Sequence, residues 1–187
     1  MKLTLRGEIL ELLPEHAVHW SSEGIFLVSD LHWGKAETFQ RHGIPVPGSI
    51  LNPELGSLVQ WDAEKLQDWT REGRLKFTLI LGNHDRKLDH LPRSWPIEAM
   101  TGPLLQGPFA FVHEPEEVPL DHYGFSGHLH PTVVVRGGHD RLRLPCFHVG
   151  RNFTVLPAFS HFTRGLIQSK APGERIFAVA GPTVIEV

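Results

Sequence analysis

Three short clusters of imidazole, amide and carboxylate side chains follow apolar runs of strand length. They are Asp30-Leu31-His32, Gly82-Asn83-His84-Asp85 and Gly127-His128-Leu129-His130. Polar side chains at the carboxyl end of a strand project into the crevice where open α/β sheets bind ligands. Carboxylate oxygens and neutral imidazole nitrogens together suit Mn²⁺, Fe or Zn²⁺. The sequence therefore predicts that these clusters converge on metal.

Each cluster has a plainer explanation when it is taken alone. Asp30 and His32 share a face of an extended chain, but an Asp-x-His pair is weak evidence for a ligand site. His128 and His130 stand between a glycine and a proline, so they could equally form a polar turn. His113 follows another apolar run and could simply close a strand. The combination is far more specific than its parts.

Taken in order, the clusters carry a family resemblance. Asp30-x-His32, Gly82-Asn83-His84-Asp85, His113 and Gly127-His128-x-His130 each follow a predicted strand. This order resembles the calcineurin-like metallophosphoesterase family. The resemblance implies an α/β fold, a four-layer αββα sandwich in which helices cover two sheets and loops hold two metal ions.

The resemblance also implies roles for individual side chains. One metal ion would be held by Asp30, His32 and His130. The other would be held by Asn83, His113 and His128. His84 would donate a proton or bind phosphate, and Asp85 would orient it. The expected ion is Mn²⁺, with Fe, Zn²⁺ and Mg²⁺ as alternatives. Beside the ligand loops, Lys35 and Arg86 are candidates for contacting substrate phosphate.

Longer stretches narrow the resemblance to one subgroup. They are residues 30–36, 43–47, 82–86, 141–147 and 156–159. The chain is similar to ligase-associated DNA-damage-response endonucleases, a bacterial group paired with an ATP-dependent DNA ligase. The resemblance implies a Mn²⁺-dependent phosphodiesterase or nuclease that acts on DNA in repair, with the ligase system as a partner. A hydrolase of small nucleotides or nucleotide-sugars is the enzymatic alternative.

The chain departs from the family at one metal ligand. The family's Gly-Asp motif supplies an aspartate that bridges the two metals, and no Gly-Asp dipeptide occurs between His32 and Gly82. The missing segment would leave the sandwich one strand short, and we expect a single bound ion. We expect the helix predicted over residues 54–72 to be interrupted at Asp62. The Asp62 carboxylate could replace the bridging aspartate only if the second helix begins beside the site. The non-enzymatic alternative is a degenerate metallophosphoesterase that binds a DNA ligase without turnover.

Composition limits the broader class of protein. At 187 residues, the chain is expected to form one domain, residues 1–187. The net charge of −3 gives no global attraction to nucleic acid or membrane. The single cysteine, Cys146, stands in an apolar context typical of a structural thiol and fits a reducing compartment. No segment approaches ~18 apolar residues, so we expect a cytoplasmic protein without a membrane partner.

Strand patterns dominate the rest of the chain. Residues 2–13 predict a hairpin or a bent strand, 25–28 a strand covered on both faces, and 36–42 a short helix. Residues 76–81 predict the strand before the second cluster. Beyond residue 103, short strands are expected at 104–105, 109–112, 123–125, 132–135, 141–149, 153–156, 176–179 and 184–187. Arg136, Arg141, Arg143 and Arg151 could contact polynucleotide phosphates or be solvated surface charges.

Overall fold

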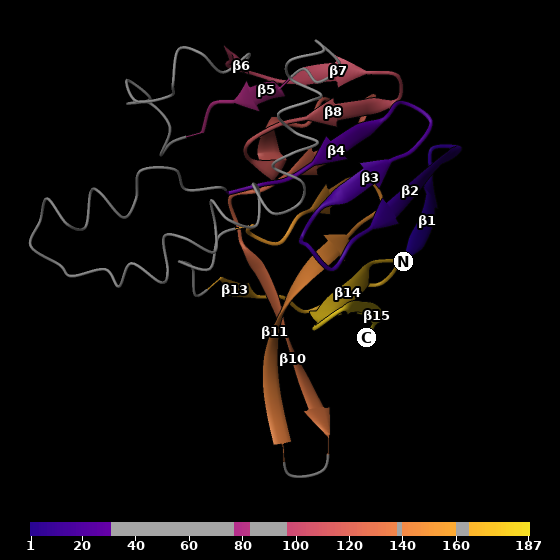
Figure 1. Ribbon diagram of the computed structural model, residues 1–187, viewed down its shortest axis with the longest axis vertical. Helices are drawn as coiled ribbons and strands as arrows, with labels where there is room; N and C mark the ends of the chain where they lie inside the picture. Colours follow the sequence, from indigo (N-terminus) through magenta and orange to yellow (C-terminus); the bar gives the residue numbers. More distant parts are fainter. Residues whose placement is uncertain (31–76, 83–96, 138–139, 160–164) are drawn as a thin grey trace, which may run out of the picture. The chain divides into compact units, whose positions relative to one another are not determined.

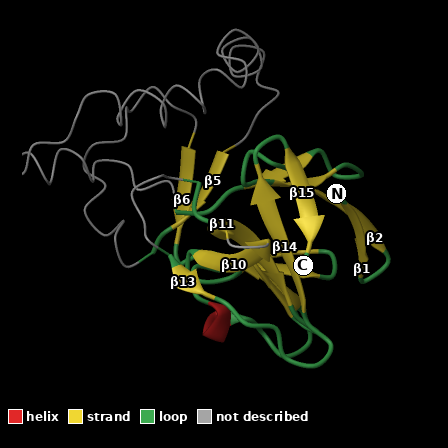
Figure 2. Cartoon of the chain, turned by 90° about the horizontal axis from the view of Figure 1, so that it is seen from below, coloured by secondary structure: helices red, strands yellow, loops and turns green. Residues whose placement is uncertain are grey.

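Strands make up almost all of the regular structure in this computed structural model, which describes residues 1–30, 77–82, 97–137, 140–159 and 165–187 (Figure 1). The described strands are β1 (Lys2–Leu5), β2 (Glu8–Leu12), β3 (Val18–Trp20), β4 (Ile25–Leu27), β5 (Phe77–Ile80), β6 (Ile97–Met100), β7 (Leu104–Gln106), β8 (Phe109–Phe111), β9 (Tyr123–Ser126), β10 (Pro131–Gly137), β11 (Asp140–Val149), β12 (Phe153–Val155), β13 (Leu166–Ile167), β14 (Arg175–Ala180) and β15 (Thr183–Glu186). One short 3₁₀ helix, η1 (Pro115–Glu117), is drawn red in Figure 2.

The chain divides into two compact units. The first, here called the discontinuous unit, combines residues 1–31 with residues 102–187. The second, here called the inserted unit, covers residues 32–101. Its described part is a pair of parallel strands, β5 and β6, in which the N–H of Leu81 also donates to the carbonyl of Met100. The expectation of one domain stays a prediction.

The first four strands form an antiparallel sheet in the order β1-β2-β3-β4. A two-residue turn, Arg6-Gly7, joins β1 to β2, and both residues have positive φ, 53° and 88°. Such turns match the twist of a hairpin. Leu10 and Leu12 of β2 are each 1% exposed, so alternate side chains of the hairpin face the interior. The predicted hairpin over 2–13 is confirmed.

A nine-stranded sheet forms the rest of the discontinuous unit. Its main path runs β13-β10-β11-β12-β9-β8-β7, and β14 pairs with both β11 and β15. Phe109, Tyr123, Phe147 and Phe177 are at most 1% exposed and form its core. Trp20 of the four-stranded sheet meets Phe109 edge to face, with ring centroids 4.8 Å apart. The two sheets therefore share one aromatic core.

The carboxyl ends of several strands meet at one edge of this unit. β8 runs parallel to β9, and β9 runs parallel to β12. The chain after β4 joins the same edge, because Ser29 forms a parallel bridge with Ala158 just after β12. The N–H of Phe159 donates to the carbonyl of Ser29 at 2.9 Å. The segments after β4, β8 and β9 are thus brought side by side, and they carry Asp30, His113 and the Gly127–His130 cluster.

The predicted αββα sandwich is wrong for the part of the chain that the structure describes. Sheets account for its regular structure, and apart from η1 no helix occurs among the described residues. The expected helices over 36–42 and 54–72 lie outside those residues. The strand at 25–28 is not covered on both faces either, since Phe26 is 42% exposed. All eight strands expected beyond residue 103 are confirmed, whereas β6 and β13 were not expected.

Candidate metal centre

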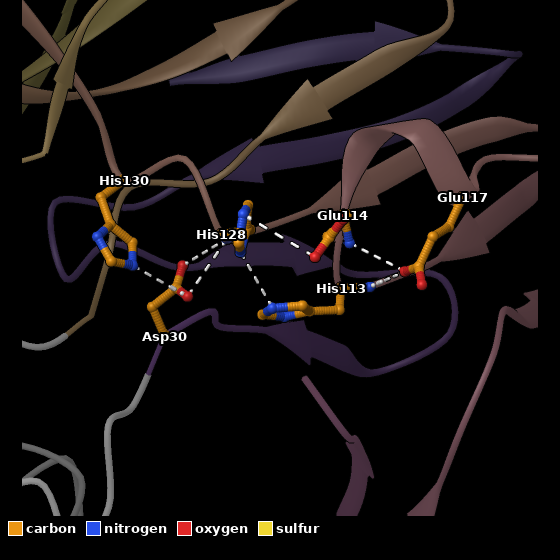
Figure 3. Close-up of polar contacts among 6 residues, drawn as sticks. All are labelled: Asp30, His113, Glu114, Glu117, His128 and His130. Atoms are coloured by element: carbon orange, nitrogen blue, oxygen red, sulfur yellow. Dashed lines mark hydrogen bonds and ion pairs between the residues drawn. The ribbon is translucent and has the colours of Figure 1, made fainter. Parts of the chain in front are cut away.

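Four predicted ligands converge at this edge: Asp30, His113, His128 and His130 (Figure 3). The Asp30 side chain is only 5% exposed, and its Oδ1 lies 3.1 Å from Nε2 of His130. The backbone N–H of His128 approaches both Asp30 oxygens, at 3.0 and 3.3 Å. His128 Nδ1 lies 3.2 Å from His113 Nε2. Burying a carboxylate is costly without partners, and here the partners are imidazole and amide groups.

The separations between these donor atoms fit ligands of bound cations. Metal–ligand bonds of about 2.1 Å place neighbouring ligands about 3.0 to 3.4 Å apart in octahedral or tetrahedral geometry. The Asp30–His130 separation of 3.1 Å and the His113–His128 separation of 3.2 Å both match that spacing. The donor set therefore suits the divalent ions expected from the sequence, with one pair of ligands on each side of the cluster.

Three of the four predicted ligands adopt left-handed backbone conformations. The φ angles of Asp30, His128 and His130 are 54°, 66° and 46°. Aspartate and histidine visit this region more readily than most residues, but the conformation is still uncommon. It costs roughly 1–2 kcal/mol per residue, and such strain concentrates at functional sites. The backbone here is shaped to aim side chains, at the expense of stability.

Gly127 allows the cluster to be this close. A Cβ at this position would lie 2.5 Å from Asp30 Oδ2 and 2.6 Å from the Cβ of Ser29. The glycine N–H also donates to the carbonyl of His113 at 3.3 Å. A side chain at residue 127 would therefore push Asp30 away from the imidazoles. This explains why a glycine precedes the two histidines.

Two glutamates that the sequence did not single out complete the cluster. Glu117 Oε2 accepts the backbone N–H groups of His113 and Glu114, at 3.1 and 3.0 Å. Glu114 Oε1 lies 3.9 Å from Nε2 of His128, an ion-pair distance rather than a hydrogen bond. His113, Glu114 and His128 offer ligand atoms within 4.8 Å of one another.

Glu114 and His113 approach opposite ring nitrogens of His128. Nδ1 faces His113, whereas Nε2 faces Glu114. An ion bound between the two histidines would thus use Nδ1, and Glu114 would favour the tautomer that keeps this nitrogen free. Carboxylates commonly accept the second N–H of a metal-binding imidazole, but at 3.9 Å Glu114 acts on His128 through its charge alone. Proline at the first helical position and Glu117 at the third are signals of a helix start. These signals could have predicted that the Glu117 carboxylate accepts the backbone N–H of His113.

The other predicted site residues are not placed by the structure. His32, Lys35, Asp62, Asn83, His84, Asp85 and Arg86 lie outside the described residues. Gly82, the first residue of the second cluster, is described and follows β5, as expected. The assignments of ligands, proton donor and phosphate contacts therefore stay predictions.

Cys146 is no part of this chemistry. Its side chain is buried in the middle of the nine-stranded sheet, with 0% exposure. Burial raises the pKa of its thiol to about 12, and a thiol that stays protonated is a poor nucleophile. The structural role expected from the sequence fits this environment.

The fold and the cluster together define a β-rich protein whose donor set suits divalent cations. The chain is similar to the solved structure of the Pseudomonas putida nuclease MPE, with 30% sequence identity and a TM-score of 0.77. The similarity covers 100% of this chain and 99% of that chain. The chain belongs to the family of this nuclease. No protein-family model and no curated protein matches it.

Among the described residues, no helix has the length and apolar character needed to cross a membrane.

Proposed function

We propose that the protein is a metal-dependent phosphoesterase that hydrolyses phosphodiester bonds in DNA. The observation that carries this proposal is the convergence of Asp30, His113, His128 and His130 at ligand-like separations. The similarity to a nuclease supports the choice of a phosphodiester as the substrate. The sequence resemblance to ligase-associated endonucleases further supports a role in DNA repair in the cytoplasm, beside an ATP-dependent DNA ligase.

Two pairs of described residues are candidates for holding a cation. Asp30 and His130 form one pair, with His32 as the third ligand expected from the sequence. His113 and His128 form the other pair, with Asn83 as its expected companion. A divalent cation at such a site would stabilise the charge that develops on phosphate oxygens during an in-line displacement. Mixed imidazole and carboxylate donors suit Mn²⁺, Fe and Zn²⁺ better than Mg²⁺.

The protein's own side chains would orient the substrate and move the proton. His84 would protonate the leaving oxygen as a general acid, and Asp85 would hold its imidazole in the required orientation. Lys35 and Arg86 would bind the substrate phosphate through charge-assisted hydrogen bonds. Glu114 and Glu117 would position the imidazoles of His128 and His113 without contacting the substrate.

The test is hydrolysis of a generic phosphodiester by the full chain, with Mn²⁺ and then with a chelator. We expect metal-dependent turnover that falls at least 10-fold in His130→Ala and Asp30→Ala, because the loss of even a group that supports a metal ligand typically costs about 10–100-fold. His122→Ala is the matched control: its imidazole also faces a carboxylate, that of Asp121, at 2.8 Å, but away from the cluster. Turnover that is unaffected by chelator and by both cluster variants would refute the proposal.

The number of metal ions bound per chain tests whether a bridging carboxylate is missing. The absence of a Gly-Asp dipeptide between His32 and Gly82 favours a single tightly held ion, because two adjacent cations would repel each other without a bridging carboxylate. Elemental analysis of the purified protein should then find one ion per chain. Two tightly held ions would show that another group, such as Asp62, supplies the bridge.

The missing Gly-Asp dipeptide also supports a second candidate function, a non-catalytic metallophosphoesterase that binds a DNA ligase. Metal binding without turnover on any phosphodiester, together with capture of the ATP-dependent ligase, would favour it. Turnover of dinucleotides or nucleotide-sugars, but of neither single- nor double-stranded DNA, would identify a small-substrate hydrolase instead.

A further inference from the structure

The end of the β10–β11 hairpin is a two-stranded ribbon that pairs with no third strand among the described residues. Residues 132–137 pair in register with residues 140–145. β13 pairs only with Pro131 and Thr132 of β10. β12 and β14 pair with β11 only between Cys146 and Val149. Within the described residues, the outer parts of β10 and β11 therefore pair with each other alone, and Figure 1 shows them extending past the neighbouring strands.

The two faces of this ribbon differ in chemistry. Directly paired residues point to the same face, and the face alternates along each strand. One face carries the apolar pairs Val133–Leu144 and Val135–Leu142, with Leu142 60% exposed, and ends in the pair Gly137–Asp140. The opposite face, here called the arginine face, carries Arg136 opposite Arg141, and Arg143 opposite Val134. All three arginines are exposed.

The arginine face concentrates positive charge. Arg136 and Arg141 are directly opposite each other, an arrangement that destabilises a strand pair. Among the described residues, neither has an ion-pair partner, and the only acidic residue of the ribbon, Asp140, stands on the other face. Arg143 is held at the base of the ribbon, where it donates to Thr132 Oγ1 at 2.9 Å and to the Gly165 carbonyl at 2.6 Å. Like charges kept together at a cost indicate an anionic ligand.

The ribbon is connected directly to the candidate metal centre. β10 begins at Pro131, the residue after His130. The carbonyl of His130 also accepts the N–H of Leu166, the first residue of β13. Arg136 lies five residues beyond Pro131, which at roughly 3.4 Å per residue is about 17 Å. At 3.4 Å of axis per nucleotide of a DNA strand, this distance corresponds to about five nucleotides.

We propose that the arginine face of the β10–β11 ribbon binds the phosphate backbone of a polynucleotide that extends from the candidate metal centre. Arginine forms bidentate contacts with phosphate, and a two-stranded ribbon has the dimensions to enter the major groove of a duplex. The inference rests on the proposed nuclease function for the identity of the ligand. The inference identifies a surface that holds the substrate and predicts the length of polynucleotide needed to reach that surface.

The experiment compares the full chain with a double variant, Arg136→Gln with Arg141→Gln. Binding is measured without metal, on a fluorescent single strand and on a duplex, each of about 20 nucleotides, which is well beyond the reach of about five nucleotides. We expect binding to weaken at least 10-fold. The slope of log affinity against log salt should become shallower by about 1.4 for the single strand or 1.8 for the duplex, as expected for two lost phosphate contacts. The charge-matched control is Lys2→Gln with Arg6→Gln, in the β1–β2 hairpin, which should leave both quantities unchanged.

Turnover provides a separate comparison. The Arg136→Gln, Arg141→Gln variant should lose kcat/KM on the long oligonucleotides but retain that of the unmodified protein on a small chromogenic phosphodiester. Arg136→Glu offers a variant that keeps the ribbon folded, because it replaces the facing like charges by an opposite pair. It should raise the melting temperature and still weaken DNA binding.

The outcomes separate the two proposals. A double variant that binds both oligonucleotides as tightly as the unmodified protein, with the same salt slope, overturns the role of the ribbon whatever the turnover. If the unmodified protein turns over no phosphodiester yet loses DNA binding in the double variant, the ribbon proposal stands and the proposed catalytic function fails.

Discussion

Replacing His128 with glycine and with alanine would measure the strain stored in the cluster. Both variants lose the imidazole, its contact with His113 Nε2 and its approach to Glu114. They keep the backbone N–H that donates to Asp30. They differ in one respect: alanine retains a Cβ at a residue whose φ is 66°.

The sign of the difference follows from two opposing effects. A left-handed residue with a Cβ pays roughly 1–2 kcal/mol, which glycine avoids. Glycine pays about 0.5–1 kcal/mol more in conformational entropy on folding. We therefore expect His128→Gly to be more stable than His128→Ala by about 1 kcal/mol. For a chain of this length, that difference is about 2–4 °C in Tm, which thermal unfolding and urea titration can both resolve.

His113 supplies the matched control, because it contributes the other imidazole of the pair and its φ is not positive. There the order should reverse, with His113→Gly less stable than His113→Ala by about 0.5–1 kcal/mol. If His128→Ala proves as stable as His128→Gly, the backbone at this residue is not strained. The interpretation of the left-handed backbone conformations as a functional adaptation would then be wrong.

Further predictions concern a close packing contact and a titrating carboxylate. Gly127→Ala should lower the melting temperature and abolish metal-dependent turnover, because the new Cβ would displace the carboxylate of the cluster; overpacking of this kind costs about 1–3 kcal/mol. Gly137→Ala is its control, since a Cβ there meets nothing within 4 Å, and equal effects of the two changes would contradict the steric argument. The backbone N–H of Ala171 and then the His148 imidazole lower the pKa of Glu174 below 4.5. The stability that this ionised carboxylate contributes is present above pH 4.5 and is lost as the pH falls through the folded-state pKa. The melting temperatures of the unmodified protein and Glu174→Gln should therefore converge in acid. A difference in melting temperature that stays constant with pH would refute this cause.

The strands were predicted well because each one is indicated by a short stretch of its own sequence. Short apolar runs separated by turn residues define most strands after residue 103, and all eight expected there are present. The short strand β13 was missed, since its two residues depend on pairing with β10 rather than on their own pattern. The layered architecture was inferred from resemblance and not from periodicity. Among the described residues it fails because no helix other than η1 is present to form the expected outer layers.

The site was predictable as a set of residues but not as a geometry. Strand ends identified Asp30, His113, His128 and His130, and the structure brings all four together. Nothing in the sequence indicated that Asp30 would be aligned by a bridge between Ser29 and Ala158, because that contact joins distant segments. The contacts of Glu114 with His128 and of Glu117 with the backbone of His113 were likewise not predicted. Ion pairs and helix caps leave only weak signals in the sequence.

The discontinuous unit has a consequence for how this protein can evolve. The chain leaves the unit after Leu31 and returns at Gly102, yet four cluster residues lie on the unit itself. The four-stranded and nine-stranded sheets contain no described strand from residues 32–101. Insertions and deletions between Leu31 and Gly102 therefore need not change the strands that hold the cluster. The predicted ligands and proton donor of that segment, His32, Asn83 and His84, could thus be gained or lost, and the reaction changed, while the same strands are inherited.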